Sequence, residues 1–595
     1  MAACIAVNLI KIKCMFLTIK KQLNSIVESA FSKAGLDGFA TNLSEATREE
    51  FGDFQANGVL AAAKSLKLNP RELAVKVVAA LELPKDMATV AIAGPGFLNF
   101  TLLDSYLAKA VNAADFESKA PLDKDYKVVI DYSSPNLAKE MHVGHLRSTI
   151  IGDALARMHL YAGHTLIKRN HVGDWGTQFG MLLAFMEAKG LTEGSEHLSL
   201  ALSDLESFYR QAKARFDEDE AFADRAHQLV VKLQGGDPKI LKLWQTFVKI
   251  SLTHCQEIYE RLHVLLTPSD VYGESYYNVM LPQVVEDLVS HGIAVDDNGA
   301  KCVFFAKGEL GDKVQEDVPP LIIQKRDGGY LYATTDLAAA YDRIDNLKAR
   351  HLLYVIDARQ SLYLQQVFRV LRRRGKLTDA TKIEHVAFGV MLGEDGRPFK
   401  TRTGGTVSLA SLLDEARHRA LQQLTERHND WSNEQLETTA EKIAIAAVKY
   451  ADLAKNRQSD YQFSFDQMLA WEGNTAPYLL YAYVRAINIL GRANEQVSSV
   501  SEFSEISTPI ERNLVKILLK WDEQLFQALS NSCPHFICNY LYQVATVFMR
   551  FYEQCPILKE ADNRVAANRL MLVKKVSENL RCGLGLLGIS VIDKM

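Results

Sequence analysis

The chain has 595 residues, of which 48% are hydrophobic and 24% charged, and its formal net charge is −4. This predicts about four domain-sized units with packed cores, and it excludes a strongly basic nucleic-acid coat without excluding a local basic stripe for RNA. No apolar run reaches the roughly 18 residues of a membrane span, and the eight cysteines form neither a C-x-x-C pair nor a Cys/His zinc spacing, so we expect a cytoplasmic protein with no membrane contact and no structural metal.

The first part of the chain predicts a small mixed domain behind a variable leader. Residues 1–16 lack the basic start, long apolar core and cleavage site of a signal peptide. From 17 to 115 helical and strand patterns alternate. Asn69 is a helix cap with Pro70 at the first helical position, and a turn at Gly94 leads into a strand. We expect an α+β accessory domain over 17–115.

The stretch Val128–Gly152 predicts an anion-binding site. Its apolar start is typical of a buried strand, a polar turn over 131–136 follows, and a helix is expected to begin near His142. The free N–H groups and the dipole at such a helix start favour a phosphate. His142 and His145 add side-chain donors, and Gly144 lets a nucleotide approach closely. The alternative is a helix that carries two unrelated surface histidines.

The strand–helix rhythm continues downstream and predicts a doubly wound parallel sheet over 116–455, with ligands at the carboxyl ends of its strands. Thr165–Asn170 is expected to be its next strand, and 196–265 a charge-rich helical insertion. The apolar runs Leu321–Gln324 and Leu352–Ile356 are expected to resume the same sheet. A separate all-α domain is expected over residues 456–595, where no strand-like alternation is found.

Two stretches of this chain resemble a known family. S-P-N-L-A-K-E-M-H-V-G-H-L-R-S-T-I-I-G is similar to the HIGH region of class I aminoacyl-tRNA synthetases, in the form typical of bacterial arginyl-tRNA synthetases. Asn170–Gly180 is similar to that family's second signature, and the likeness covers nearly the whole chain. The residues in the HIGH region are Pro135, Asn136, Ala138, Lys139, His142, Val143, Gly144 and His145.

The resemblance implies a multidomain α/β protein: a Rossmann-like parallel-sheet catalytic domain with a helical insertion, an N-terminal α+β accessory domain and a C-terminal all-α anticodon-binding domain. It implies that the protein activates L-arginine with ATP, supplied with Mg²⁺, and transfers arginine from the adenylate to tRNA(Arg). In the first step a carboxylate attacks the α-phosphorus and pyrophosphate leaves, so catalysis depends on positioning and electrostatics. His142 and His145 are the expected donors to the phosphates.

A mobile K-M-S-K-S loop serves this step in class I enzymes, and the corresponding segment here departs from that pattern. The segment 397–406 keeps Lys400 and Arg402 as cations but lacks the usual second lysine. The resemblance implies that Lys139 supplies the missing charge, one helical turn before His142 on the same face if that segment is helical. For Lys400 and Arg402 a solvated basic turn is the alternative. Met391, just before the loop, is assigned to ATP binding.

A guanidinium ligand offers five donors and no acceptor, so its site needs carboxylates in a fixed geometry. The resemblance assigns arginine binding to five residues: Asn136, Glu274, Tyr332, Asp336 and Gln360. Tyr332 and Asp336 share a face if a helix already runs there, and Gln360 follows a strand of the sheet. Taken singly, each would more often be a surface acid or amide.

Contacts with tRNA are expected at both ends of the chain. Phe97 and Asn99 fall where the family contacts the D-loop, since an aromatic ring beside an amide can stack on and read a splayed base; an ordinary core role for Phe97 is the alternative. In the C-terminal domain Tyr478 and Tyr481 lie at helical spacing with Arg485, and an aromatic core stripe is the alternative. The family resemblance adds Met595, the last residue.

Two other functions stay open at this stage. A small-molecule nucleotidyltransferase also uses H-x-G-H on a Rossmann-like sheet, but it would not need a large helical RNA-reading domain. A tRNA-binding protein with a dead site is opposed by the presence of His142, His145, Lys139 and Asp336 together. We expect an active monomer with L-arginine, ATP and tRNA(Arg) as its partners.

Overall fold

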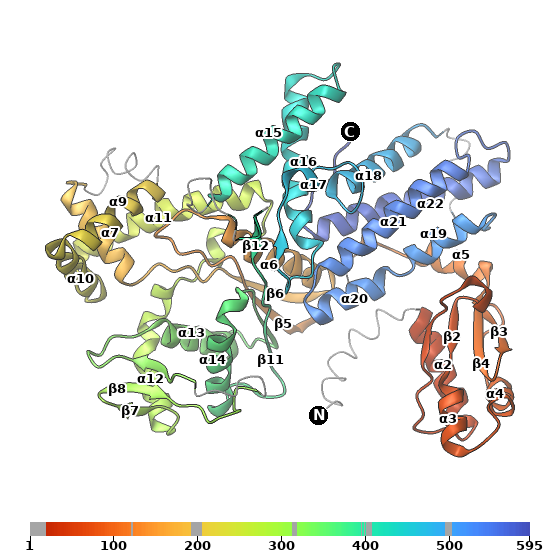
Figure 1. Ribbon diagram of the computed structural model, residues 1–595, viewed down its shortest axis with the longest axis horizontal. Helices are drawn as coiled ribbons and strands as arrows, with labels where there is room; N and C mark the ends of the chain where they lie inside the picture. Colours follow the sequence, from red (N-terminus) through yellow and green to blue (C-terminus); the bar gives the residue numbers. More distant parts are fainter. Residues whose placement is uncertain are drawn as a thin grey trace.

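The computed structural model describes residues 19–118, 120, 123–191, 205–311, 318–393, 395–397, 399, 407–493 and 502–595. The leader 1–16 and the loop cations Lys400 and Arg402 lie outside these residues. Figure 1 shows the parallel sheet at the centre of the molecule, the N-terminal sheet beside helices of the C-terminal region, and α15 projecting away from both. The predicted fold class is confirmed.

The N-terminal region is a four-stranded antiparallel sheet, in the order β1-β2-β4-β3, with helices beside it. Its strands are β1 (Leu43–Glu45), β2 (Phe54–Ala56), β3 (Ala88–Ala93) and β4 (Phe97–Leu102), and its helices are α2 (Ile19–Lys33), η1 (Glu49–Phe51), α3 (Gly58–Leu66), α4 (Pro70–Ala79) and α5 (Asp104–Ala113). Asn69 Oδ1 accepts from the backbone N–H of Arg71 at 2.9 Å, so the predicted cap of α4 is confirmed.

The central sheet is parallel, with the strand order β11-β10-β5-β6. Its members are β5 (Asp123–Asp131), β6 (His164–Arg169), β10 (His351–Tyr354) and β11 (Lys382–His385), followed or joined by α6 (Val143–Tyr161), α7 (Thr177–Ala188) and α14 (Ser361–Arg373). The register pairs Asp131 with both Arg169 and Tyr354, so three strands end at one level. That edge is where an open parallel sheet binds ligands.

The run Leu321–Gln324 does not belong to this sheet, and the prediction that it resumes it is wrong. It forms β9, the edge of a separate antiparallel sheet with β7 (Val295–Asp297) and β8 (Ala300–Val303). Ile322 is 41% exposed and Ile323 fully buried, so only one face of β9 packs. A short apolar run has the same residue composition in a parallel and in an antiparallel sheet, so composition cannot tell which sheet it joins. Near it are η3 (Glu274–Met280), α12 (Leu281–Ser290), α13 (Tyr332–Tyr341) and the π-turn η4 (Asp342–Asn346).

The described part of the predicted insertion is helical, as α9 (Leu205–Glu218), α10 (Glu220–Gln234) and α11 (Pro238–Arg261). It packs on α7 through aromatic pairs such as Phe185 with Phe208, whose ring centroids lie 5.0 Å apart. Short 3-10 turns follow at η2 (Pro268–Asp270) and, after β10, at η5 (Ala358–Gln360).

The rest of the chain is almost entirely helical. Its helices are α15 (Leu409–Arg427), α16 (Asn433–Leu453), α17 (Phe465–Met468), α18 (Ala476–Gly491), α19 (Pro509–Leu518), α20 (Trp521–Asn531), α21 (His535–Gln554) and α22 (Asn563–Leu586). The expectation of no strand after residue 456 needs one correction, because β13 (Tyr461–Gln462) pairs in parallel with β12 (Met391–Leu392). Two residues are too few to show alternation.

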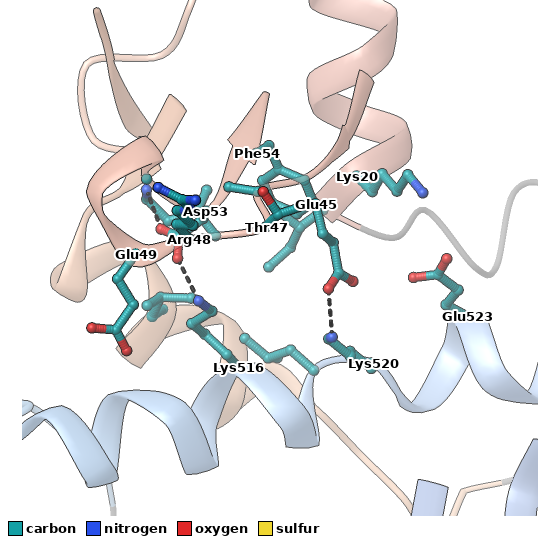
Figure 2. A pocket seen from close by; sticks show the side chains of 16 residues that line it. Lys20, Glu45, Thr47, Arg48, Glu49, Asp53, Phe54, Lys516, Lys520 and Glu523 are labelled. Carbon is teal, nitrogen blue, oxygen red and sulfur yellow. Dashed lines mark hydrogen bonds and ion pairs between the residues drawn. The ribbon is translucent and has the colours of Figure 1, made fainter. Parts of the chain in front are cut away.

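An ionic interface joins the N-terminal sheet to α19 and its junction with α20, and Figure 2 shows part of it. Asp53 receives two hydrogen bonds from Arg512, at 2.9 and 2.8 Å, and Lys516 Nζ lies 2.6 Å away. Glu45 pairs with Lys520 at 2.8 Å. Burial alone would raise the pKa of Asp53, but the two cations and a hydrogen bond from the N–H of Leu102 outweigh it and lower the pKa to about 2.

Candidate active site

The two histidines of the HIGH region cap the start of α6. His142 is the N-cap, with extended backbone, and its Nδ1 accepts from the N–H of Gly144 at 3.1 Å. His145 Nδ1 accepts from the N–H of His142 at 3.1 Å. The ring centroids lie 4.0 Å apart. Two backbone donors that a helix start leaves without partners are thereby satisfied by imidazoles rather than by the usual small polar residues.

Burial and the capping hydrogen bonds together decide the protonation of both rings: burial keeps them neutral, and the capping bonds decide which nitrogen carries the proton. Burial lowers the pKa of His142, with a further contribution from the charge of Lys139. Burial, followed by the neighbouring His142, lowers the pKa of His145 to about 3. Both rings are therefore neutral near pH 7. Because each Nδ1 accepts a hydrogen bond, the single proton of each ring lies on Nε2, which makes that nitrogen a donor.

Gly144 lies directly against the imidazole ring of His142. A Cβ at this position would lie 2.9 Å from His142 Nδ1 and 2.8 Å from Cε1. Any side chain here would push the His142 ring out of its capping position. The structure thus gives a reason for the glycine that the expectation of close nucleotide approach did not include.

The turn before α6 is built on two consecutive left-handed residues, Ser133 with φ 68° and Ser134 with φ 46°. Ser134 is held in place because its N–H donates to Asn170 Oδ1 at 3.0 Å and its Oγ donates to Asp131 Oδ1 at 2.8 Å. The two signature stretches then run side by side, with the N–H of Gly173 donating to the Pro135 carbonyl at 3.1 Å.

The remaining HIGH-region residues divide by exposure. Pro135, Ala138 and Val143 are buried, so they are packing residues of the turn and of α6. Asn136 is exposed, and its Oδ1 accepts from the N–H of Ala138 at 3.0 Å.

Lys139 is not on a helix. The expectation that it lies one helical turn before His142 is wrong, because α6 begins at Val143 and Lys139 lies in the preceding bend. Its charge still contributes to the lowered pKa of both His142 and His145. Its Nζ lies 4.5 Å from the ring centroid of Tyr209, on the helical insertion.

The chain on either side of the loop 400–406 is tied to this site. Met391 in β12 is 5% exposed, and its carbonyl accepts from the N–H of Phe399 at 3.1 Å. After the loop, Val407 accepts from the N–H of Val143 at 3.1 Å, so the chain rejoins directly at the start of α6. Met391 is therefore a buried strand residue near the loop.

A group of carboxylates lies at the carboxyl edge of the sheet. Asp336 on α13 has Oδ1 3.5 Å from His171 Nε2, and its Oδ2 accepts from the Tyr363 hydroxyl. Glu274 begins η3 next to Ser275, whose N–H and Oγ donate to Asp174 at 2.9 and 2.6 Å. Among the described residues, no lysine or arginine lies within ion-pair distance of Glu274, Asp336 or Asp174.

The electrostatics of this group follow from that lack of cations. Burial, then the charges of Asp174 and Asp336, raise the pKa of Glu274 to about 8. Burial also raises the pKa of Asp336 against the opposing effects of His171 and Tyr363. The buried guanidinium of Arg343 pairs with Asp131 at 2.7 Å, and its charge only partly offsets the raised pKa of Asp336. Such a group favours a cationic ligand.

Tyr332 and Gln360 are both exposed residues on the elements that carry Asp336 and Tyr363 or directly precede them. Tyr332 begins α13, so it shares that helix with Asp336 as expected; it is 61% exposed, and its ring lies 4.9 Å from that of Tyr363. Gln360 is exposed at the end of η5, directly before the helix that carries Tyr363.

Three residues in contact with this group were missed at the level of sequence. His171 and Asp174 lie inside the second signature stretch, Asn170–Gly180. The sequence therefore pointed to this stretch, but no role was predicted for either residue. Tyr363 had no signal, because a tyrosine on an amphipathic helix is ordinary. Gly273 shows how closely the parts fit, since a Cβ there would lie 2.4 Å from Asp174 Oδ2.

The candidate RNA-reading residues occupy two other places. Tyr481, Arg485 and Met595 line one surface cavity. Arg485 stacks between Tyr481 and Tyr552, 4.7 Å from each ring centroid, whereas Tyr478 packs toward Tyr542 on α21. The structure brings three of the four together.

In the N-terminal sheet, Phe97 and Asn99 lie on the face of β4 opposite the core residues Leu98 and Phe100. Asn99 is 8% exposed and accepts a hydrogen bond from Gln55 at 2.8 Å. Phe97 is half-buried on the outward side, which speaks against the core role considered for it.

Within the residues described, no three His, Cys, Asp or Glu side chains are grouped so as to hold a metal ion. In the same part of the chain no helix is both long and apolar enough to cross a membrane. The site consists of imidazole donors at the start of α6, a lysine just before it and, across the sheet edge, carboxylates that have no lysine or arginine within ion-pair distance among the described residues.

Three family models match successive parts of the chain. They are an arginyl-tRNA synthetase N-terminal domain over residues 18–102, a class I (R) tRNA synthetase catalytic domain over 108–465, and a DALR anticodon-binding domain over 479–595.

Curated relatives match over their full lengths. The chain is 51% identical to an arginine–tRNA ligase of Saccharophagus degradans and 49% identical to one of Chromobacterium violaceum, and each match covers 97% of this chain and 100% of the relative. Among solved structures, arginyl-tRNA synthetase of Plasmodium falciparum is 28% identical with a TM-score of 0.82, over 97% of this chain and 99% of that one. The Thermus thermophilus arginyl-tRNA synthetase, 24% identical with a TM-score of 0.80 over 97% and 100% of the two chains, shares the fold.

Proposed function

The chain belongs to the arginyl-tRNA synthetase family and acts as an arginine–tRNA ligase, and from this premise we propose which of its residues carry each part of the reaction. The protein activates L-arginine with ATP to arginyl-adenylate and pyrophosphate, then transfers arginine to the 3′-terminal adenosine of tRNA(Arg). The sequence-level alternatives, a small-molecule nucleotidyltransferase and a protein with a dead site, are set aside on the same ground.

His142 and His145 bind the phosphates of ATP through Nε2–H, and Lys139 places a positive charge on the pyrophosphate side. Charge that builds on the phosphate oxygens in the transition state is stabilised by donors that need no rearrangement, because the capping bonds already fix both rings. Lys400 and Arg402 supply further charge, Gly144 leaves the His142 ring in place, and Met391 supports the nucleotide from β12. ATP enters as its Mg²⁺ complex.

Asp336 and Glu274 bind the cationic groups of arginine, with Asn136, Tyr332 and Gln360 around them. The observation that carries this assignment is the group of carboxylates without a lysine or arginine partner among the described residues. A guanidinium satisfies two carboxylates in a planar arrangement that an ammonium cannot match. Positioning the arginine carboxylate toward the α-phosphorus beside His142 then converts the attack into an intramolecular step.

RNA contacts are divided between the ends of the chain. Phe97 and Asn99 contact the D-loop, and Tyr478, Tyr481, Arg485 and Met595 read the anticodon. We propose the domain division 17–115, 116–455 and 456–595, with 1–16 as a variable leader, for a monomer that works in the cytoplasm.

The test of the arginine site is ATP–pyrophosphate exchange with saturating tRNA(Arg), with Glu274→Gln as the variant. The change keeps the shape of the side chain and removes its charge, so we expect the KM for arginine to rise about a hundredfold while the KM for ATP stays the same. The exchange reaction run across the twenty amino acids, with and without tRNA, is the reference. An unchanged KM for arginine would remove Glu274 from the site.

A further inference from the structure

One aromatic ring of the helical insertion faces Lys139 at the proposed nucleotide site. Tyr209 lies on α9, 70 positions after Lys139 in the chain, and its ring centroid lies 4.5 Å from Lys139 Nζ. An ammonium at this distance over an aromatic face is attracted by the negative face of the ring. Tyr209 itself is 9% exposed, so the ring is part of the packed insertion.

Lys139 has little else to hold it. It lies in the bend before α6, where no helix fixes the direction of its side chain. Within the part of the chain that the structure describes, no carboxylate lies within ion-pair distance of Lys139. The side chain is flexible and long, so without a partner its charge would be spread over many positions.

Tyr209, in contrast, is on a rigid support. The neighbouring Phe208 is 5% exposed and packs edge-on against Phe185 of α7 at 5.0 Å, and Ala212, one turn later, is fully buried. Phe185 also contacts Phe222 of α10 at 6.5 Å. The part of α9 that carries Tyr209 is therefore anchored in a core of three helices, α7, α9 and α10.

We propose that Tyr209 is a positioning residue that holds the Lys139 ammonium at the nucleotide site, and that the helical insertion serves arginine activation through this contact. The inference rests on the role proposed above for Lys139. An aromatic ring suits the task better than a carboxylate would, because it orients the cation without cancelling the charge that the pyrophosphate needs.

The experiment measures ATP–pyrophosphate exchange with saturating tRNA(Arg) and arginine in four variants: Tyr209→Leu, Tyr209→Phe, Lys139→Ala and the double variant Lys139→Ala/Tyr209→Leu. Tyr209→Leu should lower the exchange rate about tenfold with little change in the KM for arginine. Tyr209→Phe, which keeps the ring, should recover most of the rate. In the double variant the loss should equal that of Lys139→Ala alone, because the ring then has no cation to hold.

The matched control is Phe216→Leu, a ring on the same helix that lies under Lys213 at 5.5 Å and outside this site. It should leave the exchange rate unchanged, whereas a general loosening of α9 would lower it. A Tyr209→Leu loss that adds in full to that of Lys139→Ala would overturn the inference, as would a wild-type rate in Tyr209→Leu. A wild-type rate in Lys139→Ala would instead remove the proposed role of Lys139.

Discussion

Asp53 and Glu274 are both carboxylates that the fold withdraws from water, yet their environments differ in kind. Asp53 faces Arg512 and Lys516 of its own chain, and its pKa is lowered to about 2 in spite of burial. Glu274 faces Asp174 and Asp336, and its pKa is raised to about 8. Burial acts in the same direction on both groups, so the difference comes from their neighbours: two cations and the backbone N–H of Leu102 at Asp53, and two carboxylates at Glu274.

The comparison separates carboxylates that stabilise the fold from carboxylates that bind a ligand. A carboxylate such as Asp53 pairs with cations of its own chain as soon as the protein folds, and this pairing holds two domains together. A carboxylate that is buried next to other carboxylates has no positive partner until a cationic ligand binds. Keeping it buried in the free protein costs stability. Four predictions test this distinction, in descending order of expected effect.

The largest effect is expected for Asp336→Asn. Loss of the charge that faces the guanidinium should lower kcat/KM for arginine about a hundredfold or more, roughly 3 kcal/mol. The ratio of kcat/KM for arginine to kcat/KM for citrulline, which carries a neutral ureido group, should decrease in the same variant. Asp53→Asn, the matched change at the paired carboxylate, should leave the arginine-to-citrulline ratio unchanged. An unchanged ratio in Asp336→Asn would show that this residue does not face the side-chain head group.

The second effect is expected at the interface between the N-terminal sheet and α19. Arg512→Met removes both hydrogen bonds to Asp53 but leaves Lys516 in place, so we expect a cost of about 2 kcal/mol in domain docking rather than the 3–5 kcal/mol of a fully unpaired buried charge. Amide hydrogen exchange across β2 and β4 is the measurement, and Arg512→Lys should recover part of the protection. Exchange at the wild-type rate would mean that the hydrogen bonds from Arg512 to Asp53 do not contribute to domain docking.

The third prediction uses pH. Arginine binds best when Glu274 is ionised, and its pKa of about 8 in the free protein means that few molecules are ionised at pH 6.5. Affinity for arginine should therefore increase roughly tenfold between pH 6.5 and 8, as measured by calorimetry, and Glu274→Gln should flatten the profile. Asp53 has a lowered pKa, so its contribution to stability is complete above its unfolded pKa and is lost only as the pH falls toward 2. Domain docking should not change over the range in which arginine affinity does.

The smallest effect is expected for Lys520→Ala. Glu45 and Lys520 keep 47% and 30% of their side-chain surface, and a pair this exposed contributes at most about 1 kcal/mol. Hydrogen exchange in β1 should be almost unchanged. If Lys520→Ala opened the interface as much as Arg512→Met, the ion pairs would act as one network, and burial would not be the quantity that ranks them.

Many elements of the fold and of the site could be predicted from the sequence, wherever a short stretch of residues has a strong local pattern. The strand, turn and helix around His142 and the cap at Asn69 follow from apolar runs and capping residues, and both were predicted. The error at Leu321–Gln324 has the opposite cause, since a four-residue apolar run carries no information on which sheet it joins. Lys139 shows a different limit. Its importance came from the resemblance, but its support by Tyr209, far along the chain, depends on tertiary packing that no local pattern records.

The carboxylates show a third limit. Glu274 and Asp336 could be named from the resemblance, but not the protonation that their mutual burial imposes, nor the partners His171 and Tyr363. Distances between side chains on different elements decide these properties. Sequence reasoning thus found the residues and missed their electrostatic state.

The caps at the start of α6 also decide which substitutions position 142 can accept under selection. The side chain there must accept a hydrogen bond from the helix at one atom and donate one outward from another. Asparagine can do both, with Oδ1 toward Gly144 and Nδ2 outward, although its reach is shorter. Aspartate caps equally well but has no proton to offer, and serine would have to use a single oxygen for both tasks. In a randomised library screened for growth, asparagine should therefore be the first replacement to survive, ahead of aspartate and serine, which cap helices about as well.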